Sequence, residues 1–249
     1  MKVSIIIPAY NEEKRIERTL INYCNFFDQT KRNENIEAKI ITVLNGCTDK
    51  TYDIVLDLKH KYKTIEIINL KKPGKGLAVI AGFKSALRSE NDLIGFVDAD
   101  MATKPKYYYE LIKNIKKYDA IIASRYMKGA QVTPKRPFIK DWGRKIVYNP
   151  LNKILFGINY KDFQCGAKLF KPYALKGIVN KLKAEQWAFD VELLYLCKKN
   201  KFDVKEIPTI WHDQTDSKFK TVGSGLNMIA SLFKLRLYHS PFSKFFNTT

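Results

Sequence analysis

The chain has 249 residues, of which 45% are hydrophobic, 13% aromatic and 28% charged. This length and composition indicate a globular protein with a substantial core, and they exclude a disulfide-stapled peptide, a collagen-like chain and a disordered chain. Because 44 Lys and Arg stand against 25 Asp and Glu, the net charge is +19, and we expect the surface to attract nucleic acid, phosphorylated small molecules or anionic lipid.

Short apolar, β-branched segments alternate with segments of helical period through the first half of the chain. This alternation predicts an α/β fold with a mostly parallel sheet flanked by helices. The predicted strands are Val3–Pro8, Ala38–Leu44, Ile65–Asn69, Leu93–Asp98 and Ala120–Arg125. Ligands of such sheets bind beyond the carboxyl ends of the strands, so we expect the loops after these strands to carry the site.

The alternation weakens after the fifth strand. Tyr126–Pro137 is rich in Gly, Pro and Lys and is expected to be a mobile connection or lid. The elements predicted beyond it are helices over Ile139–Phe156 and Trp187–Lys199, a short strand over Gly166–Phe170 and an edge strand over Val204–Trp211. The last belongs at an edge because Pro208 has no N–H to donate to a neighbouring strand.

Residues 217–249 contain five basic residues and no acidic one. The spacing of Leu226, Ile229, Phe233 and Leu237 predicts a basic amphipathic helix, which either packs on the sheet or binds an anionic membrane surface. No apolar run has the length of a signal peptide or a transmembrane helix. Four separated cysteines without a Cys-X-X-Cys pair favour a reduced intracellular protein. We therefore expect a peripheral protein on the cytoplasmic side of a membrane.

Two carboxylates, Asp98 and Asp100, follow the fourth predicted strand. Hard oxygen ligands at this edge of the sheet suit Mg²⁺ or Mn²⁺, with positions left open for phosphate oxygens. A solvated turn closed by an Asx cap is the alternative.

Two other loops are suited to a nucleotide. Lys71–Gly76 combines glycines and lysines before a helix, whose N-terminus offers N–H groups to an anion, although its spacing is not that of a Walker loop. In Pro8–Glu12, the ring of Tyr10 could stack on a base and Glu12 could bond ribose hydroxyls. The alternatives are a basic surface turn for the first loop and, for the second, an ordinary strand exit with an Asn helix cap.

In combination and in order, these motifs resemble those of family 2 glycosyltransferases, most closely the branch that acts on polyprenyl or dolichyl phosphate. The segments that carry the resemblance are Pro8–Glu12, Asn45–Asp49, Gly74–Gly76, Asp98–Asp100, Ser124–Arg125, Asp162–Gly166 and Trp187–Glu192. The resemblance implies a GT-A fold, that of nucleotide-diphospho-sugar transferases, over residues 1–216, followed by the basic amphipathic tail 217–249.

The resemblance also implies roles for individual residues. The residues matched to the donor are Pro8, Tyr10 and Glu12 for the nucleoside, Asn45 for the base, Lys75 for the nucleotide, and Asp98 and Asp100 for Mg²⁺ or Mn²⁺ on the diphosphate. Arg125 and Lys218 match positions that meet phosphate near the acceptor. Asp162 and Gln164 lie in the segment that approaches the reacting sugar, and Asp162 and Asp190 are the candidates if a general base is used.

The function that the resemblance implies is inverting transfer of a hexose from a nucleotide-diphospho-sugar to polyprenyl or dolichyl phosphate. UDP-glucose comes before GDP-mannose as donor, because Asp162–Gly166 looks more like the glucosyl branch. The chain departs from the family pattern at Asn45, where many relatives have Asp, at Cys47, where Ser is usual, and at Ala102, which cannot add a metal ligand.

Three alternatives stay open. A related glycosyltransferase would use a sugar hydroxyl of a glycan or glycolipid as acceptor. A sugar nucleotidyltransferase would share a similar sheet but usually has a Gly-rich loop after the first strand. A basic nucleic-acid-binding protein fits the charge, but the chain shows neither a basic stripe with interleaved aromatics nor a helix-turn-helix, so no specific nucleic acid is expected.

Overall fold

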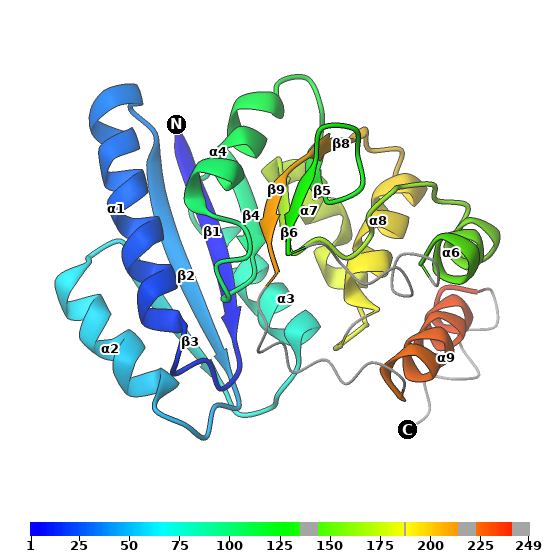
Figure 1. Cartoon of the computed structure of the whole chain (residues 1–249), viewed down its shortest axis with the longest axis horizontal. Helices are drawn as coiled ribbons and strands as arrows, with labels where there is room; N and C mark the ends of the chain where they lie inside the picture. The colour runs from blue at the N-terminus through cyan, green and yellow to red at the C-terminus, as the bar shows by residue number, and fades with distance from the viewer. Residues whose placement is uncertain (135–143, 187, 214–222, 241–249) are drawn as a thin grey trace.

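A seven-stranded sheet with helices on both faces forms the body of the molecule (Figure 1). The computed structural model describes residues 1–134, 144–186, 188–213 and 223–240. The strand order is β3-β2-β1-β4-β7-β5-β8. Its strands are β1 (Lys2–Ala9), β2 (Glu37–Asn45), β3 (Ile65–Leu70), β4 (Leu93–Val97), β5 (Ala120–Ser124), β7 (Ala167–Phe170) and β8 (Val204–Pro208). All neighbours are parallel except β7, which is antiparallel to both β4 and β5.

The five strands predicted in the first half of the chain are confirmed, each to within one residue at either end. Their β-branched apolar residues are buried on both faces of the sheet, as parallel strands require. Successive residues of β1 show this, because Ile5 and Ile7 belong to one core cluster and Ile6 to the other.

Each face of the sheet is covered by its own set of helices. The helices of the first cluster are α1 (Ile16–Glu34), α2 (Thr51–Lys61) and α4 (Pro105–Asn114). Those of the second are α3 (Lys75–Ala86), α7 (Pro172–Ile178), which a 3₁₀ turn over Val179–Lys181 extends, and α8 (Phe189–Lys199). The predicted helix over residues 187–199 is thus confirmed from Phe189 on, and residue 187 lies outside the described residues.

The second half departs from the prediction in two places. The predicted edge strand Val204–Trp211 is split in two, because the chain leaves the sheet after Pro208 and Ile210–His212 (β9) pairs in parallel with Gln131–Thr133 (β6). Only its first part, β8, is an edge strand of the main sheet. The predicted helix over residues 139–156 is a π-helical turn over Arg144–Tyr148 followed by α6 (Asn149–Phe156), with residues 139–143 outside the described part. The predicted lid contains β6. Its last residues, 135–137, lie outside the described part of the chain.

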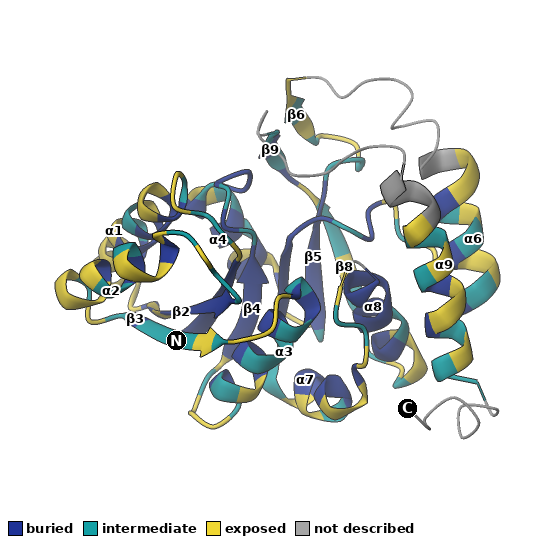
Figure 2. Cartoon of the chain, turned by 90° about the horizontal axis from the view of Figure 1, so that it is seen from below, coloured by how far each residue is buried: buried dark blue, intermediate teal, exposed yellow. Residues whose placement is uncertain are grey.

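The described part of the C-terminal tail is helix α9 (Gly223–Tyr238), which lies beside α6 (Figures 1 and 2). Leu232 and Leu235 are buried in a third core cluster, whereas Phe233 is 50% and Leu237 44% exposed. One face of this helix therefore packs on the domain, as the first alternative predicts, and Phe233 and Leu237 of the predicted stripe are exposed. Binding to an anionic membrane surface stays a prediction. Within the described ranges, no helix combines the length and the apolar character needed to cross a bilayer.

Candidate functional site

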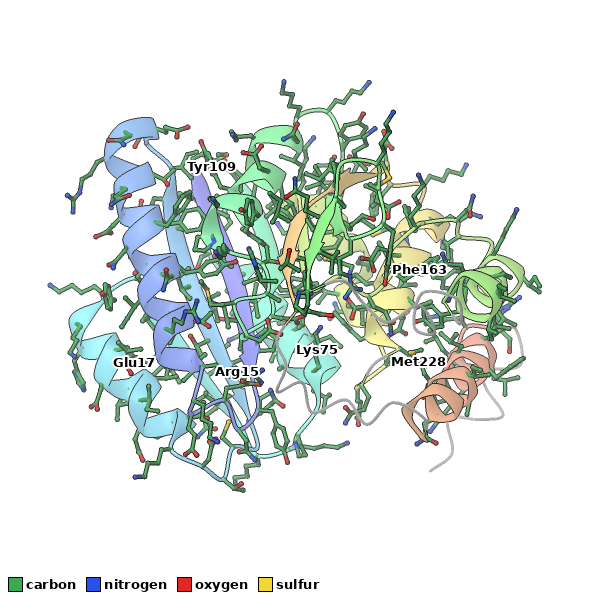
Figure 3. All side chains as sticks on the ribbon, viewed as in Figure 1. Arg15, Glu17, Lys75, Tyr109, Phe163 and Met228 are labelled. Atoms are coloured by element: carbon green, nitrogen blue, oxygen red, sulfur yellow. The ribbon has the colours of Figure 1, made fainter. Side chains whose placement is uncertain are left out.

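Four parallel strands bring the predicted donor residues to one edge of the sheet. Strands β3, β2, β1 and β4 are neighbours and point the same way, so the loops after them lie together. Figure 3 shows Arg15 and Lys75 at this edge, where β1 ends. The arrangement is the one that the sequence predicts for the loops around Tyr10, Asn45 and Asp98.

Lys75 is the charged centre of this edge. Its Nζ lies 2.7 Å from Asp98 Oδ1 and 3.8 Å from Asp190 Oδ2. Burial alone would lower the pKa of the Lys75 ammonium, but the two carboxylates outweigh it and raise that pKa. Lys75 is therefore a fixed positive charge at the ends of β3 and β4, as a diphosphate site needs.

The helix that Lys75 begins does not offer all its first N–H groups to a ligand. The N–H of Gly76 donates to the Glu185 carbonyl oxygen at 2.9 Å, and the N–H of Leu77 approaches the same oxygen at 3.4 Å. A Cβ on Gly76 would lie only 2.2 Å from the Ala184 carbonyl oxygen, so this close packing requires glycine. The expectation of free N–H groups is thus wrong for these two residues, because the 184–185 backbone occupies them.

Asp98 and Asp100 are neighbouring carboxylates, and the charge of Asp98 acts on Asp100 although Lys75 lies 2.7 Å from Asp98. Burial raises the pKa of Asp100 to about 6, and the charge of Asp98 adds to the rise, against lowering effects of the Ala102 N–H, Arg15 and Lys75. The Ala102 N–H donates to Asp100 Oδ1 at 2.9 Å, so the Asx turn considered as an alternative is also present. A divalent cation would relieve the repulsion of this pair, and carboxylate oxygens are the ligands that Mg²⁺ and Mn²⁺ prefer. The residues present therefore fit a metal.

Gly166 allows Asp98 to occupy its position. The Asp98 N–H donates to the Gly166 carbonyl oxygen at 3.0 Å, and a Cβ on Gly166 would lie 1.8 Å from Asp98 Oδ2. No side chain fits there without displacing the carboxylate. Among the described residues, no group of three or more His, Cys, Asp or Glu is arranged to hold a metal, so Asp98 and Asp100 stand as a pair.

The three predicted nucleoside residues of the first loop differ in exposure, and Glu12 is half-buried. Tyr10 is 43% exposed, whereas Pro8 is buried in β1 opposite Val43. Glu12 accepts two hydrogen bonds of 2.7 Å from Arg15, whose positive charge also lowers the pKa of Asp100. The sequence reasoning missed Arg15, which lies three residues after Glu12 at the start of α1, the spacing of a helical ion pair.

Asn45 connects three of the loops. Its Nδ2 donates to the Ala9 carbonyl oxygen at 2.9 Å, and its Oδ1 accepts from the Gly74 N–H at 3.1 Å. The side chain is buried. Asn45 therefore braces the first loop against the Gly-Lys loop, and an Asp at this position could not donate the first of these bonds.

Arg125, matched to the acceptor phosphate, and Asp162, matched to the segment near the reacting sugar, lie on the other half of the sheet and bind each other. Asp162 accepts from Arg125 Nε at 2.7 Å, from its NH2 group at 2.8 Å and from its backbone N–H at 3.0 Å. The guanidinium also lies 4.8 Å from the centre of the Trp211 ring. Burial alone would raise the pKa of Asp162, but the ion pair with Arg125 outweighs it and lowers that pKa.

Gln164 and Asp190 complete the described residues of the predicted set. Gln164 Nε2 donates to the Sδ of Met228 in α9 at 2.9 Å, while its N–H donates to Asp162. Asp190 is buried in α8, and its Oδ1 lies 2.5 Å from Nζ of Lys168, a residue that the sequence reasoning missed. A lysine inside the otherwise apolar segment Ala167–Phe170 was the available signal. Lys218 lies outside the described residues.

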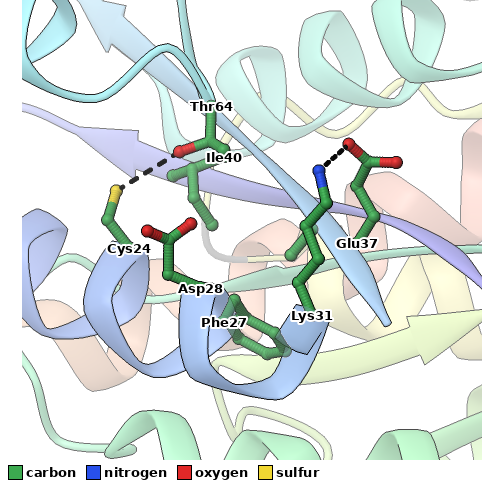
Figure 4. A pocket seen from close by; sticks show the side chains of 8 residues that line it. Cys24, Phe27, Asp28, Lys31, Glu37, Ile40 and Thr64 are labelled. Atoms are coloured by element: carbon green, nitrogen blue, oxygen red, sulfur yellow. Dashed lines mark hydrogen bonds and ion pairs between the residues drawn. The ribbon is translucent and has the colours of Figure 1, made fainter. Parts of the chain in front are cut away.

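A cavity beside the C-terminal half of α1 shares no residue with this site (Figure 4). It lies between α1 and the starts of β2 and β3, beside Cys24 and Thr64. Its volume of about 10 Å³ is at most that of one water molecule, so it has no room for a substrate.

Comparison with known proteins agrees with this geometry. The model of the family "Glycosyl transferase family 2" matches residues 4–179. The chain belongs to this family. Membership decides for a glycosyltransferase over the sugar nucleotidyltransferase and the nucleic-acid-binding protein considered from the sequence.

Similar proteins carry more specific names. A dolichyl-phosphate beta-glucosyltransferase of Trichomonas vaginalis is 34% identical over 94% of this chain and 71% of its own length. The Drosophila melanogaster protein of the same name is 33% identical, over 94% of this chain and 74% of its own length. The Saccharomyces cerevisiae protein of that name is 31% identical, over 94% of this chain and 74% of its own length.

The solved structures establish the fold. Glucosyl-3-phosphoglycerate synthase from Mycobacterium tuberculosis, in complex with Mn²⁺, UDP and phosphoglyceric acid, superposes with a TM-score of 0.70. The match covers 95% of this chain and 77% of that one at 15% identity. The GT-A fold predicted from the sequence is therefore confirmed.

Proposed function

We propose that this glycosyltransferase transfers glucose from UDP-glucose to dolichyl phosphate or a related polyprenyl phosphate, with inversion at the anomeric carbon. The observation that carries the proposal is the cluster of Lys75, Asp98 and Asp100 at the ends of β3 and β4, with Nζ of Lys75 2.7 Å from Asp98. The names of the relatives support the acceptor and the sugar. Their β product also supports inversion, because the sugar of UDP-glucose is α-linked. GDP-mannose is the second choice of donor.

The donor half of the site supplies positive charge to the leaving diphosphate. Asp98 and Asp100 would hold Mg²⁺ or Mn²⁺, and the bound cation would supply positive charge to the departing nucleoside diphosphate. Lys75 adds a second charge from the start of α3, and Tyr10 presents an exposed ring on which the base can stack. These groups bind and orient the donor, and Arg15 holds Glu12 beside it.

The acceptor half needs no strong base. A phosphate monoester is already an anion near neutral pH, so it can attack the anomeric carbon without losing a proton to the protein. The two candidate bases are both engaged: Asp162 is paired with Arg125, which keeps its pKa low, and Asp190 is paired with Lys168. We therefore assign Asp162 and Arg125 to positioning the segment that carries Gln164.

A lipid acceptor requires contact with a membrane, and the end of the molecule formed by α6 and α9 has the chemistry for it. The exposed apolar residues of the π-helical turn, α6 and α9, which we call the apolar end face, are Ile146, Val147, Ile154, Phe233 and Leu237. Figure 2 shows exposed ribbon along the outer sides of these two helices. Lys153 and Lys234 are exposed on the same helices and would attract anionic headgroups. We propose that this face rests on the bilayer.

Labelled sugar tests the reaction. The protein is incubated with Mn²⁺, dolichyl phosphate and either UDP-[¹⁴C]glucose or GDP-[¹⁴C]mannose, and the lipid is extracted into organic solvent. We expect label in the lipid from UDP-glucose, loss of the label with EDTA, and a β-anomeric product by NMR. Label that appears only in a water-soluble glycan would contradict the lipid acceptor.

Flotation with liposomes tests the membrane face separately. The double variant Phe233→Ser/Leu237→Ser should lose most of its binding to liposomes of phosphatidylcholine and phosphatidylserine, while it still binds UDP. The control is Tyr52→Ser, which removes an exposed aromatic side chain from α2, away from α6 and α9. Equal flotation of the double variant and the wild type would contradict this assignment.

A further inference from the structure

Lys168 is a fully buried lysine that the mechanism above does not use. It lies on β7, the antiparallel strand between β4 and β5. Its Nζ donates to Asp190 Oδ1 at 2.5 Å and to the Cys165 carbonyl oxygen at 2.7 Å, and it lies 5.3 Å from the centre of the Phe96 ring. Burying an ammonium group costs several kcal/mol, which the ion pair with Asp190 offsets, and the same ion pair occupies one oxygen of Asp190.

The partner of Lys168 leads to the donor site. The other oxygen of Asp190 lies 3.8 Å from Nζ of Lys75, and Lys75 contacts Asp98 at 2.7 Å. A row of alternating charges thus begins in the core and ends at a carboxylate proposed to bind the metal. Its members are Lys168, Asp190, Lys75 and Asp98. The side chains of Lys75 and Asp98 are partly exposed, whereas the two inner members are buried.

We propose that Lys168 is a positioning residue for donor binding. By holding one oxygen of Asp190, it prevents this buried carboxylate from drawing Lys75 inward, away from Asp98 and the diphosphate. Without Lys168, the nearest cation to Asp190 among the described residues is Lys75, and the strong attraction between charges at low dielectric would pull its ammonium toward α8. The inference rests on the proposed function, because it concerns the binding of a nucleoside diphosphate with its metal.

Calorimetric titration of UDP in the presence of Mn²⁺ measures the effect without any transfer step. We expect Lys168→Met to weaken this binding about ten-fold or more, the size of effect seen when a group that orients a metal ligand is removed. The double variant Lys168→Met/Asp190→Asn should bind within about three-fold of the wild type, because the uncharged Asn no longer competes for Lys75. The control is Lys176→Met, which removes an exposed lysine from α7.

The outcomes separate the two proposals. A wild type that does not bind UDP with Mn²⁺ contradicts the proposed function, and this inference with it. If the wild type binds and Lys168→Met binds equally well, or if the double variant is as weak as Lys168→Met, only this inference fails.

If Lys168→Met does not fold, the double variant Lys168→Met/Asp190→Asn decides, because it strands no buried charge. We expect it to bind UDP with Mn²⁺ within about three-fold of the wild type, and binding that is about ten-fold weaker or more overturns the proposal.

Discussion

The two halves of the site hold their carboxylates in opposite ways. At the donor side, the Asp98 side chain is 26% exposed, and burial together with the charge of Asp98 raises the pKa of Asp100 to about 6. At the acceptor side, Asp162 is 2% exposed and bound by Arg125, which lowers its pKa against the effect of burial. A carboxylate pair that is partly exposed and in which one pKa is raised is a place where an added cation can bind. A carboxylate with a complete set of partners is a part of the framework.

Removal of a donor carboxylate should have the largest effect. Asp100→Ala is expected to lower the rate of sugar transfer by about 10³-fold or more, because the leaving diphosphate loses the cation that neutralises it. The same assay on Asp57→Ala, which removes an exposed carboxylate from α2, should show wild-type rates. Near-normal transfer by Asp100→Ala would remove the metal from the mechanism.

Removal of the acceptor-side carboxylate should act on stability instead. Asp162→Asn leaves the buried Arg125 guanidinium without its counter-charge, so the free energy of unfolding should fall by about 3–5 kcal/mol. Urea unfolding at pH 7 measures this. In Arg125→Leu/Asp162→Leu no charge is stranded, and we expect that variant to recover part of the loss. If Asp162→Asn were as stable as the wild type, the distinction between the two halves would not hold.

The raised pKa of Asp100 predicts a pH dependence of stability in the metal-free protein. A carboxyl group whose pKa is higher in the folded than in the unfolded chain binds its proton more tightly in the folded chain. The folded state therefore loses stability as the pH rises from about 4 to about 6. Relative to Asp100→Asn, we expect the wild type to lose about 2 kcal/mol of unfolding free energy over this interval, measured in EDTA. Parallel pH curves for the two proteins would show that Asp100 has an ordinary pKa.

The smallest effect is expected at the exposed ring of the first loop. Tyr10→Ala should weaken UDP binding about five-fold through the lost stacking on the base, whereas Tyr10→Phe should retain it. Fluorescence titration with UDP in Mn²⁺ measures both. Equal affinities for Tyr10→Ala and the wild type would place the base elsewhere.

The donor half could be predicted well from the sequence, and the reason is its topology. In a parallel sheet, residues that end neighbouring strands meet at one edge, so Asn45, Lys75 and Asp98 could be placed together from the strand pattern alone. The role of Asn45 was less accessible, because its two hydrogen bonds to Ala9 and Gly74 depend on how the loops pack.

The acceptor half could be predicted only in part. Hydrophobic pattern shows that Ala167–Phe170 is a strand, but not that it runs antiparallel between β4 and β5. That placement is what buries Lys168 beside Asp190 and pairs Arg125 with Asp162. The stripe containing Phe233 was found from its period, but the period could not show that Leu232 and Leu235 are the residues that pack inward.

A crystal structure with Mn²⁺ and UDP, with anomalous scattering used to locate the manganese, tests the central claim most directly. We expect one manganese within coordination distance of an Asp98 or Asp100 carboxylate oxygen and of the diphosphate, with Lys75 beside the same phosphates. A UDP molecule bound at another edge of the sheet, or bound at this edge with no manganese at either carboxylate, would contradict the account.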